Sequence, residues 1–312
     1  MSKLVVLGSV NADHVLHVAH FPRAGETMNG HHYAVIAGGK GANQAVAAAR
    51  LGADVAFIAC VGDDNFGLDI RNKFSKDGIN VDGVMVEENT PTGIAMIQVA
   101  ESGENSICIS AEANAHLTVA RLQPHLESIR QADMLLMQLE TPLETVLEAA
   151  KVARKSSTKV ILNPAPAQNL SDELLSLVDI ITPNETEALL LTGIEVCDDI
   201  SAQQAATILH NKGIKLVLIT LGQQGVWLSE SKSISENNNG CKIAAFHVKA
   251  VDTTAAGDTF NGALLTRLLE KNSLPEAIIF AHAAAAITVT GKGAQTSIPY
   301  REQVDHFLQK ML

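Results

Sequence analysis

The stretch MLLMQLETPLETVLEAAKVARKSSTKVIL, at residues 134–162, holds two apolar runs separated by a helical pattern. The runs at 134–139 and 160–162 are continuous rather than alternating in polarity, which is typical of parallel strands covered on both faces. Between them, residues 142–156 predict a helix that is capped by Thr141 and has Pro142 at its first position. A strand, a helix and a second strand in this order predict one unit of a parallel sheet.

The same order recurs along the 312 residues of the chain. Further apolar runs of strand length lie at 4–7, 55–61, 179–182 and 216–220, and further helical patterns at 41–51 and 64–77. A hairpin of 225–229 and 242–248 around the polar loop 230–240 follows, and then three helices that begin at Gly257, Leu274 and Tyr300. The pattern predicts a single α/β domain over 1–312, doubly wound, with a mainly parallel central sheet flanked by helices.

Two segments, about 13–36 and 93–111, break this order. Polar and apolar residues alternate in them with glycines between, as in exposed antiparallel strands. They predict insertions that form a small separate β-sheet, which we call the lid. Because its apolar side chains need a covering surface, two lids are expected to pack together in a homodimer. These side chains are Val15, Val18, Val35, Ile94, Met96, Ile97 and Ile107.

Charge and hydropathy exclude some classes of protein. The chain carries 23 Lys and Arg against 34 Asp and Glu, a net charge of −11, which repels polyphosphate backbones and predicts no nucleic-acid partner. No apolar run reaches the roughly 18 residues that a membrane span needs. The first residues also lack a signal-peptide pattern, so we expect a cytoplasmic protein without a membrane partner.

Cysteines and histidines give no metal or redox motif. No CxxC pair occurs. Because Cys60, Cys108 and Cys197 lie in or beside apolar segments, we expect them to be small core or strand residues. His14 and His17 recur in a spacing that sends them to opposite faces of a strand, which favours a lid surface over a metal site.

Two common nucleotide-binding motifs are also absent. Lys40 follows two glycines but precedes Gly41, so the segment is not a P-loop. No GxGxxG follows the first apolar run, where residues 7–13 read LGSVNAD. P-loop kinases and nicotinamide dehydrogenases are therefore disfavoured.

Residues 251–260, VDTTAAGDTF, lead into a helical pattern and predict an anion site. Gly257 permits close approach of a ligand, and the first turn of a helix offers unpaired N–H groups and a positive dipole end. Asp258 has two interpretations: an ordinary helix cap, or the base that takes a proton from a hydroxyl as it attacks a γ-phosphorus. The small Ala255 and Ala256 leave room for substrate.

Three further segments bear on that choice. Residues 38–44, GGKGANQ, suit a hydroxylated or anionic ligand, or form a plain glycine loop. Asn184 and Glu187 lie one turn apart, where they form either a capping box or a site for hydrated Mg²⁺ beside phosphate. Residues 220–225, TLGQQG, are a glycine turn able to lie against a nucleotide.

Together these motifs resemble those of the ribokinase-like carbohydrate kinases, in order and over nearly the whole chain. The resemblance rests on 11–13 (NAD), 38–43 (GGKGAN), 184–187 (NETE) and 252–258 (DTTAAGD). It implies transfer of the γ-phosphoryl group of ATP to the 5-hydroxyl of D-ribose.

The resemblance also implies a role for each matching residue. Asp258 would be the base, and Ala256, Gly257 and Asp258 would frame the anion hole. The sugar would be held by Asn11, Asp13, Gly39, Lys40, Asn43, Glu140 and Asp258. The nucleotide would contact Asn184, Thr220, Gly222, Gly225, Gly257 and His282. Glu187 would organise Mg²⁺, and a K⁺ ion would match Asp252, Thr254, Thr288, Gly291, Gly293 and Ser297.

Two alternatives remain open. A kinase for another small sugar, such as deoxyribose or fructose, or for a nucleoside would share the same signature. A sugar-binding regulator without catalysis is disfavoured, because a binding module has no use for a base at the anion hole.

Overall fold

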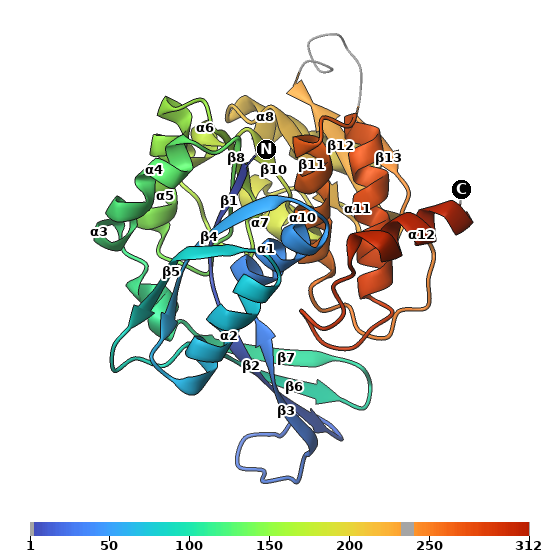
Figure 1. Cartoon of the computed structure of the whole chain (residues 1–312). Coiled ribbons are helices and arrows are strands. Elements are labelled where there is room, and N and C mark those ends of the chain that lie inside the picture. Colours follow the sequence, from blue (N-terminus) through green and yellow to red (C-terminus); the bar gives the residue numbers. More distant parts are fainter. Residues whose placement is uncertain (1–2, 232–239, 312) are drawn as a thin grey trace.

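The computed structural model describes residues 3–231 and 240–311 and holds a large sheet with helices on both faces (Figure 1). Within these residues, nine strands run in the order β13-β12-β11-β10-β9-β8-β1-β4-β5. All neighbours from β5 to β11 are parallel, and β11, β12 and β13 pair antiparallel. The predicted mainly parallel sheet is confirmed. The strands are β1 (Lys3–Leu7), β4 (Asp54–Gly62), β5 (Asn80–Glu87), β8 (Met134–Met137), β9 (Lys159–Leu162), β10 (Ile180–Ile181), β11 (Leu216–Thr220), β12 (Val226–Glu230) and β13 (Cys241–Ile243).

The two faces of the sheet each bury their own apolar cluster. Side chains alternate along a strand, so Leu4 and Val6 of β1 enter one cluster and Val5 and Leu7 the other. The first cluster lies under α1 (Lys40–Arg50), α2 (Asn65–Lys76), α10 (Ala256–Leu269), α11 (Leu274–Thr288) and α12 (Arg301–Met311). The second lies under α3 (Val119–Leu122), α4 (Leu126–Arg130), α5 (Leu143–Lys155), α6 (Asp172–Leu177), α7 (Glu185–Thr192) and α8 (Asp199–Asn211). Short 3₁₀ helices are η1 (Glu112–His116), η2 (Gln123–His125) and η3 (Gly222–Gln224).

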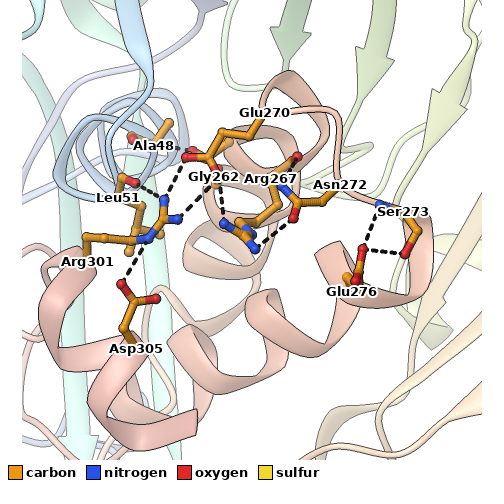
Figure 2. Close-up of polar contacts among 11 residues, drawn as sticks. Ala48, Leu51, Gly262, Arg267, Glu270, Asn272, Ser273, Glu276, Arg301 and Asp305 are labelled. Atoms are coloured by element: carbon orange, nitrogen blue, oxygen red, sulfur yellow. Dashed lines mark hydrogen bonds and ion pairs between the residues drawn. The ribbon is translucent and has the colours of Figure 1, made fainter. Parts of the chain in front are cut away.

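The C-terminal helix is tied to its neighbours by one polar network (Figure 2). Arg301 of α12 donates to the Leu51 carbonyl at the end of α1 (3.0 Å) and to Glu270 at the end of α10 (2.7 Å). Arg267 of α10 donates to the same Glu270 carboxylate (2.6 Å). The network fixes α12 against the two helices whose first turns face the candidate site.

Several sequence-based boundaries needed correction, most of them by one or two residues. Pro142 is the N-cap itself and α5 begins at Leu143, one residue later than expected, with Thr141 outside the helix. The second hairpin strand ends at Ile243 rather than at residue 248. Strand β5 was not predicted, and most of the expected polar loop 230–240 lies outside the described residues.

The lid is a four-stranded sheet in the order β3-β2-β6-β7. Its strands are β2 (Asn11–Val18), β3 (His31–Gly38), β6 (Gly93–Ala100) and β7 (Asn105–Ser110). The expectation of antiparallel strands is wrong for the central pair, because β2 and β6 run parallel. The reason lies in their origins: β2 follows β1 and β6 follows β5, and both of those strands end at the same edge of the large sheet.

The cysteines divide into one buried and three exposed thiols. Cys60 is buried in β4, and Cys108 is an exposed strand residue of the lid. Cys197 lies exposed in the loop before α8, so its assignment to core or strand is wrong. In the described part of the chain, no helix is long and apolar enough to cross a membrane.

Candidate active site

Helix α10 begins at the carboxyl edge of the large sheet, and its first turn carries the predicted anion site. Its N-cap is Ala255, held in the left-handed conformation (φ 60°, ψ 10°), so no side chain caps the helix. A Cβ built on Gly257 would meet no atom within 4 Å. Open space therefore lies over the turn whose N–H groups have no intrahelical partners.

The carboxylate of Asp258 is buried and held by two amides of α1. Its Oδ2 accepts from Asn43 Nδ2 (2.9 Å) and its Oδ1 from Gln44 Nε2 (2.8 Å). Because both oxygens face α1, Asp258 is not the cap of its own helix, and that interpretation is wrong. A carboxylate held in this way is free to accept a proton at its remaining lone pairs.

A group of buried charges surrounds Asp258. Burial raises the pKa of Asp13 to about 7, and the Glu140 and Asp258 carboxylates add to the effect. Burial lowers the pKa of Lys40, but the carboxylates around it, led by Asp258, outweigh this and raise the pKa above its usual value. Because Asp13 and Lys40 both feel the charges of Glu140 and Asp258, these four side chains lie in one site.

Local contacts fix the rest of the predicted sugar residues. Asn11 Oδ1 accepts from Asn114 Nδ2 (2.8 Å), which leaves the Asn11 amide to donate elsewhere. Glu140 Oε2 accepts from Ser9 Oγ (2.5 Å) and from the Lys40 backbone N–H (3.0 Å). Gly39 adopts φ 91° against the backbone of residues 9–11, where a side chain would clash.

A cavity of about 410 Å³ opens beside the anion site. All six residues that the resemblance assigned to the nucleotide line it, together with Ala256. Those six are Asn184, Thr220, Gly222, Gly225, Gly257 and His282. Burial lowers the pKa of His282 to about 4, so its ring is neutral at pH 7.

The sequence missed most of the apolar wall of this cavity. It is formed by Ala245, Phe246, Val248, Ala250, Phe260, Ala285, Ala286 and Val289, and His247 lies among them. Residues 245–248 alternate like a strand, but β13 ends at Ile243 and the chain then runs along the cavity. Ala285, Ala286 and Val289 lie three, four and seven residues after His282, on the same face of a helix. This spacing could have predicted that they line the cavity.

Asn184 and Glu187 form a capping box at the start of α7. Asn184 Oδ1 accepts from the Glu187 N–H (2.8 Å), and Glu187 Oε2 accepts from the Asn184 N–H (2.9 Å). Burial raises the pKa of the Glu187 carboxyl. The prediction of a capping box is thus confirmed. The capping box leaves lone pairs on the Glu187 carboxylate for further ligands.

The predicted K⁺ residues meet where two loops join. Asp252 Oδ1 accepts from the Thr254 N–H (2.9 Å), and its Oδ2 from the Gly293 N–H (2.9 Å). Ser297 Oγ donates to the Gly293 carbonyl (2.6 Å). Gly291 donates its N–H to the Thr288 carbonyl (3.1 Å), so all six positions fall on these loops or at the end of α11. Across the described residues, no group of three or more His, Cys, Asp and Glu is placed to hold a metal, the lid histidines included.

Comparison with known proteins assigns the chain to a family. Residues 1–301 match the model of the pfkB family of carbohydrate kinases. The chain belongs to this family. As a pfkB-family member, it is 55% identical to a ribokinase of Haemophilus influenzae over 98% of both chains. It is 35% identical to a deoxyribokinase of Salmonella typhi over 98% of both chains.

Solved structures agree with this carbohydrate-kinase assignment. A ribokinase from Thermotoga maritima has a TM-score of 0.87 at 39% identity, covering 99% of each chain. A ribokinase from Arabidopsis thaliana, solved with ribose and ATP, has a TM-score of 0.91 at 35% identity, covering 99% of each chain. The fold is thus that of ribokinases.

Proposed function

We propose that this carbohydrate kinase transfers the γ-phosphoryl group of ATP to the 5-hydroxyl of D-ribose. The observation that carries the proposal is the position of Gly257 and Asp258. Gly257 lines the 410 Å³ cavity, and the next residue is bonded to Asn43 and lies among the charges of Asp13 and Lys40. One helical turn thus joins a nucleotide-sized cavity to a polar site suited to a polyol. The ribokinase relatives support ribose as that polyol.

The chemistry follows from these neighbours. Asp258 takes the proton of the 5-hydroxyl as that oxygen bonds to the γ-phosphorus and the bond from phosphorus to the β-phosphate oxygen breaks. The products are ribose 5-phosphate and ADP. The N–H groups of Ala256, Gly257 and Asp258 stabilise the negative charge that develops on the phosphoryl oxygens.

The polar residues around Asp258 select and orient the sugar. The carboxylates of Asp13 and Glu140 accept from neighbouring hydroxyls, while Asn11, Lys40 and Asn43 donate to the ring and hydroxyl oxygens. Gly39 leaves room for the sugar to approach the backbone. Lid closure over these groups would exclude water that would otherwise hydrolyse ATP.

Two cations fit the oxygen-rich chemistry of their sites. Glu187 would hold Mg²⁺ through water, since Mg²⁺ keeps several waters and takes one or two carboxylates beside phosphates. The carboxylate of Asp252 and the backbone carbonyls of these two loops are oxygen ligands, which suit K⁺. Its charge would help to hold the anion-site N–H groups in place. The other proposed K⁺ positions are Thr254, Thr288, Gly291 and Ser297.

The lid supports a proposed homodimer. Cross-strand partners lie on the same face, so Val35, His14 and Met96 share the face opposite Asp13. Val35 is 43% exposed and Met96 is 56% exposed there, and Tyr33 adjoins them. The expectation that Val18 belongs to the exposed surface is wrong, because it is 2% exposed. A second lid would bury this apolar face.

An assay of several acceptors tests the substrate. ATP-dependent phosphorylation is measured with ribose, deoxyribose, fructose and adenosine, and the highest kcat/KM is expected for ribose. A preference for deoxyribose or adenosine would replace the proposed substrate, and no turnover with any acceptor would refute the kinase. We propose a cytoplasmic location, where ATP is available.

A further inference from the structure

A chain of buried amides ends on the carboxylate of Asp258. Gln44, the fifth residue of α1, is fully buried and donates from Nε2 to Asp258 Oδ1 (2.8 Å). The same Nε2 donates to Asn163 Oδ1 (2.9 Å), and Gln44 Oε1 accepts from Gln138 Nε2 (2.5 Å). All three polar contacts of the Gln44 side chain thus run to fixed partners.

The direction of each amide in this chain is determined by chemistry. A carboxylate only accepts, so the group of Gln44 that faces Asp258 must be its NH₂. Its carbonyl oxygen then faces Gln138, which donates. Asn163 donates from Nδ2 to the Thr182 carbonyl (3.0 Å), which leaves its oxygen for Gln44.

The anchors of the chain stand at the carboxyl ends of three neighbouring strands. Gln138 follows β8, Asn163 follows β9 and Thr182 follows β10. A Cβ on Gly8, after β1, would lie 2.1 Å from Gln138 Oε1, so this glycine leaves the space that Gln138 fills. Residues at the carboxyl ends of the central strands therefore support the amide of Gln44.

The same series of hydrogen bonds continues from Thr182 to the anion site. Thr182 Oγ1 donates to Asn261 Oδ1 (2.8 Å), and Asn261 Nδ2 donates to the Gly257 carbonyl (2.9 Å). One network thus fixes both the carboxylate of Asp258 and the backbone of the residue before it.

We infer that Gln44 is a positioning residue that holds the Asp258 carboxylate in the orientation needed to accept the sugar proton. This rests on the proposed function. Without the amide at Oδ1, the carboxylate keeps only the bond from Asn43 and is free to rotate about its χ2 angle. Asn43 is itself a proposed sugar ligand, so Gln44 is the donor left to hold the base while substrate binds. Being fully buried, Gln44 acts on the base and leaves sugar affinity to other residues.

The variant Gln44→Met keeps the side-chain volume and removes the donor. We expect kcat to fall about 10- to 100-fold, as for a misoriented catalytic group, while KM for ribose changes less than about twofold. Gln138→Met removes the donor that orients Gln44 and should lower kcat less. The double variant should be no slower than Gln44→Met alone, because both changes act through one contact.

Thr158→Val provides the matched control. Thr158 is buried at the opposite end of β9, and its hydroxyl donates to the carbonyls of Ile129 (2.9 Å) and Ala132 (3.0 Å). This control should lower the melting temperature as Gln44→Met does, with kcat unchanged. Equal kcat for Gln44→Met and wild type, or a rise in KM alone, would overturn the inference.

A crystal structure of Gln44→Met separates this inference from the proposed function. If the wild type phosphorylates no sugar, the proposed function fails, but the orientation of Asp258 is still measurable. Rotation of its carboxylate by more than about 30° would support the positioning role. An unmoved, well-ordered carboxylate would overturn it.

Discussion

Gly38 lies against Asp13 so closely that a Cβ at position 38 would stand 2.0 Å from Asp13 Oδ2. Gly38 ends β3 and Asp13 lies in the neighbouring strand β2, so the glycine makes room for the carboxylate. A methyl group here must displace either the strand or the carboxylate, and the carboxylate is a proposed sugar ligand.

The variant Gly38→Ala should therefore weaken sugar binding. We expect KM for ribose to rise about tenfold or more, as for loss of one hydrogen bond to a charged group. Calorimetry with a non-hydrolysable ATP analogue serves as the control, because the nucleotide cavity does not include residue 38. An unchanged KM would contradict the predicted loss of a sugar contact at Asp13.

The proposed base is tested by Asp258→Asn. The variant keeps the shape of the side chain but cannot take the proton, so kcat should fall about 10²- to 10⁴-fold while ribose still binds. Asp305→Asn, a change in the exposed part of α12, is the control for an unrelated carboxylate. Near-normal turnover of Asp258→Asn would contradict the assignment.

The cation loops predict a dependence on K⁺. Activity should rise when K⁺ is added to buffer free of K⁺ and Na⁺ at matched ionic strength. Asp252→Ala should blunt this rise, because it removes the acceptor for the Thr254 and Gly293 N–H groups that joins the two loops. Equal rates with and without K⁺ would exclude the proposed site.

The lid face predicts the oligomeric state. Light scattering at micromolar concentration should give a dimer, and Met96→Asp should give a monomer, since a buried unpaired charge opposes association. Ile200→Asp, at a residue 70% exposed on α8, tests whether any exposed apolar side chain has this effect. A monomeric wild type would refute the proposed interface.

The sequence predicted the strands that are buried on both faces, because short continuous apolar runs such as those of β4 and β11 are typical of such strands. It missed β5, where Asp82 and Gly83 interrupt the apolar pattern at the edge of the sheet. The parallel pairing of β2 with β6 was not predictable, since alternation reveals an exposed face but not the direction of the partner strand.

The candidate site likewise contains residues that the sequence predicted and contacts that it did not. Motifs placed Asn43 and Asp258 in the candidate site and included Gln44 among the donors to a ligand, but they did not indicate that the Gln44 amide would hold Asp258. Its importance depends on Gln138 and Asn163, which are 94 and 119 residues away in the chain. Such contacts follow from the order of strands in the sheet rather than from any local pattern.

The raised pKa of Asp13 predicts opposite effects of pH on binding and stability. Its pKa of about 7 in the folded chain lies above the ordinary value of 3.8, so the folded state binds the extra proton between these limits. Stability from this group is therefore present below about pH 4 and is lost as pH rises to about 7. At pH 8 the buried carboxylate is charged and destabilises the fold, but it then accepts from sugar hydroxyls. Asp13→Asn should consequently melt at a higher temperature than wild type at pH 8, and the difference should shrink towards pH 4.

The same variant should bind ribose more weakly at pH 8. The charged carboxylate of Asp13 would thus favour sugar binding and lower the stability of the fold. Differential scanning calorimetry from pH 4 to pH 8 measures the first effect, and ribose titration at pH 8 the second. For wild type, ribose affinity should fall as pH drops below about 7 and Asp13 is protonated. Asp305→Asn, at an exposed carboxyl, should show neither effect. A melting difference between Asp13→Asn and wild type that stays constant with pH would mean that Asp13 does not titrate in this range, and the predicted loss of affinity would then have no basis.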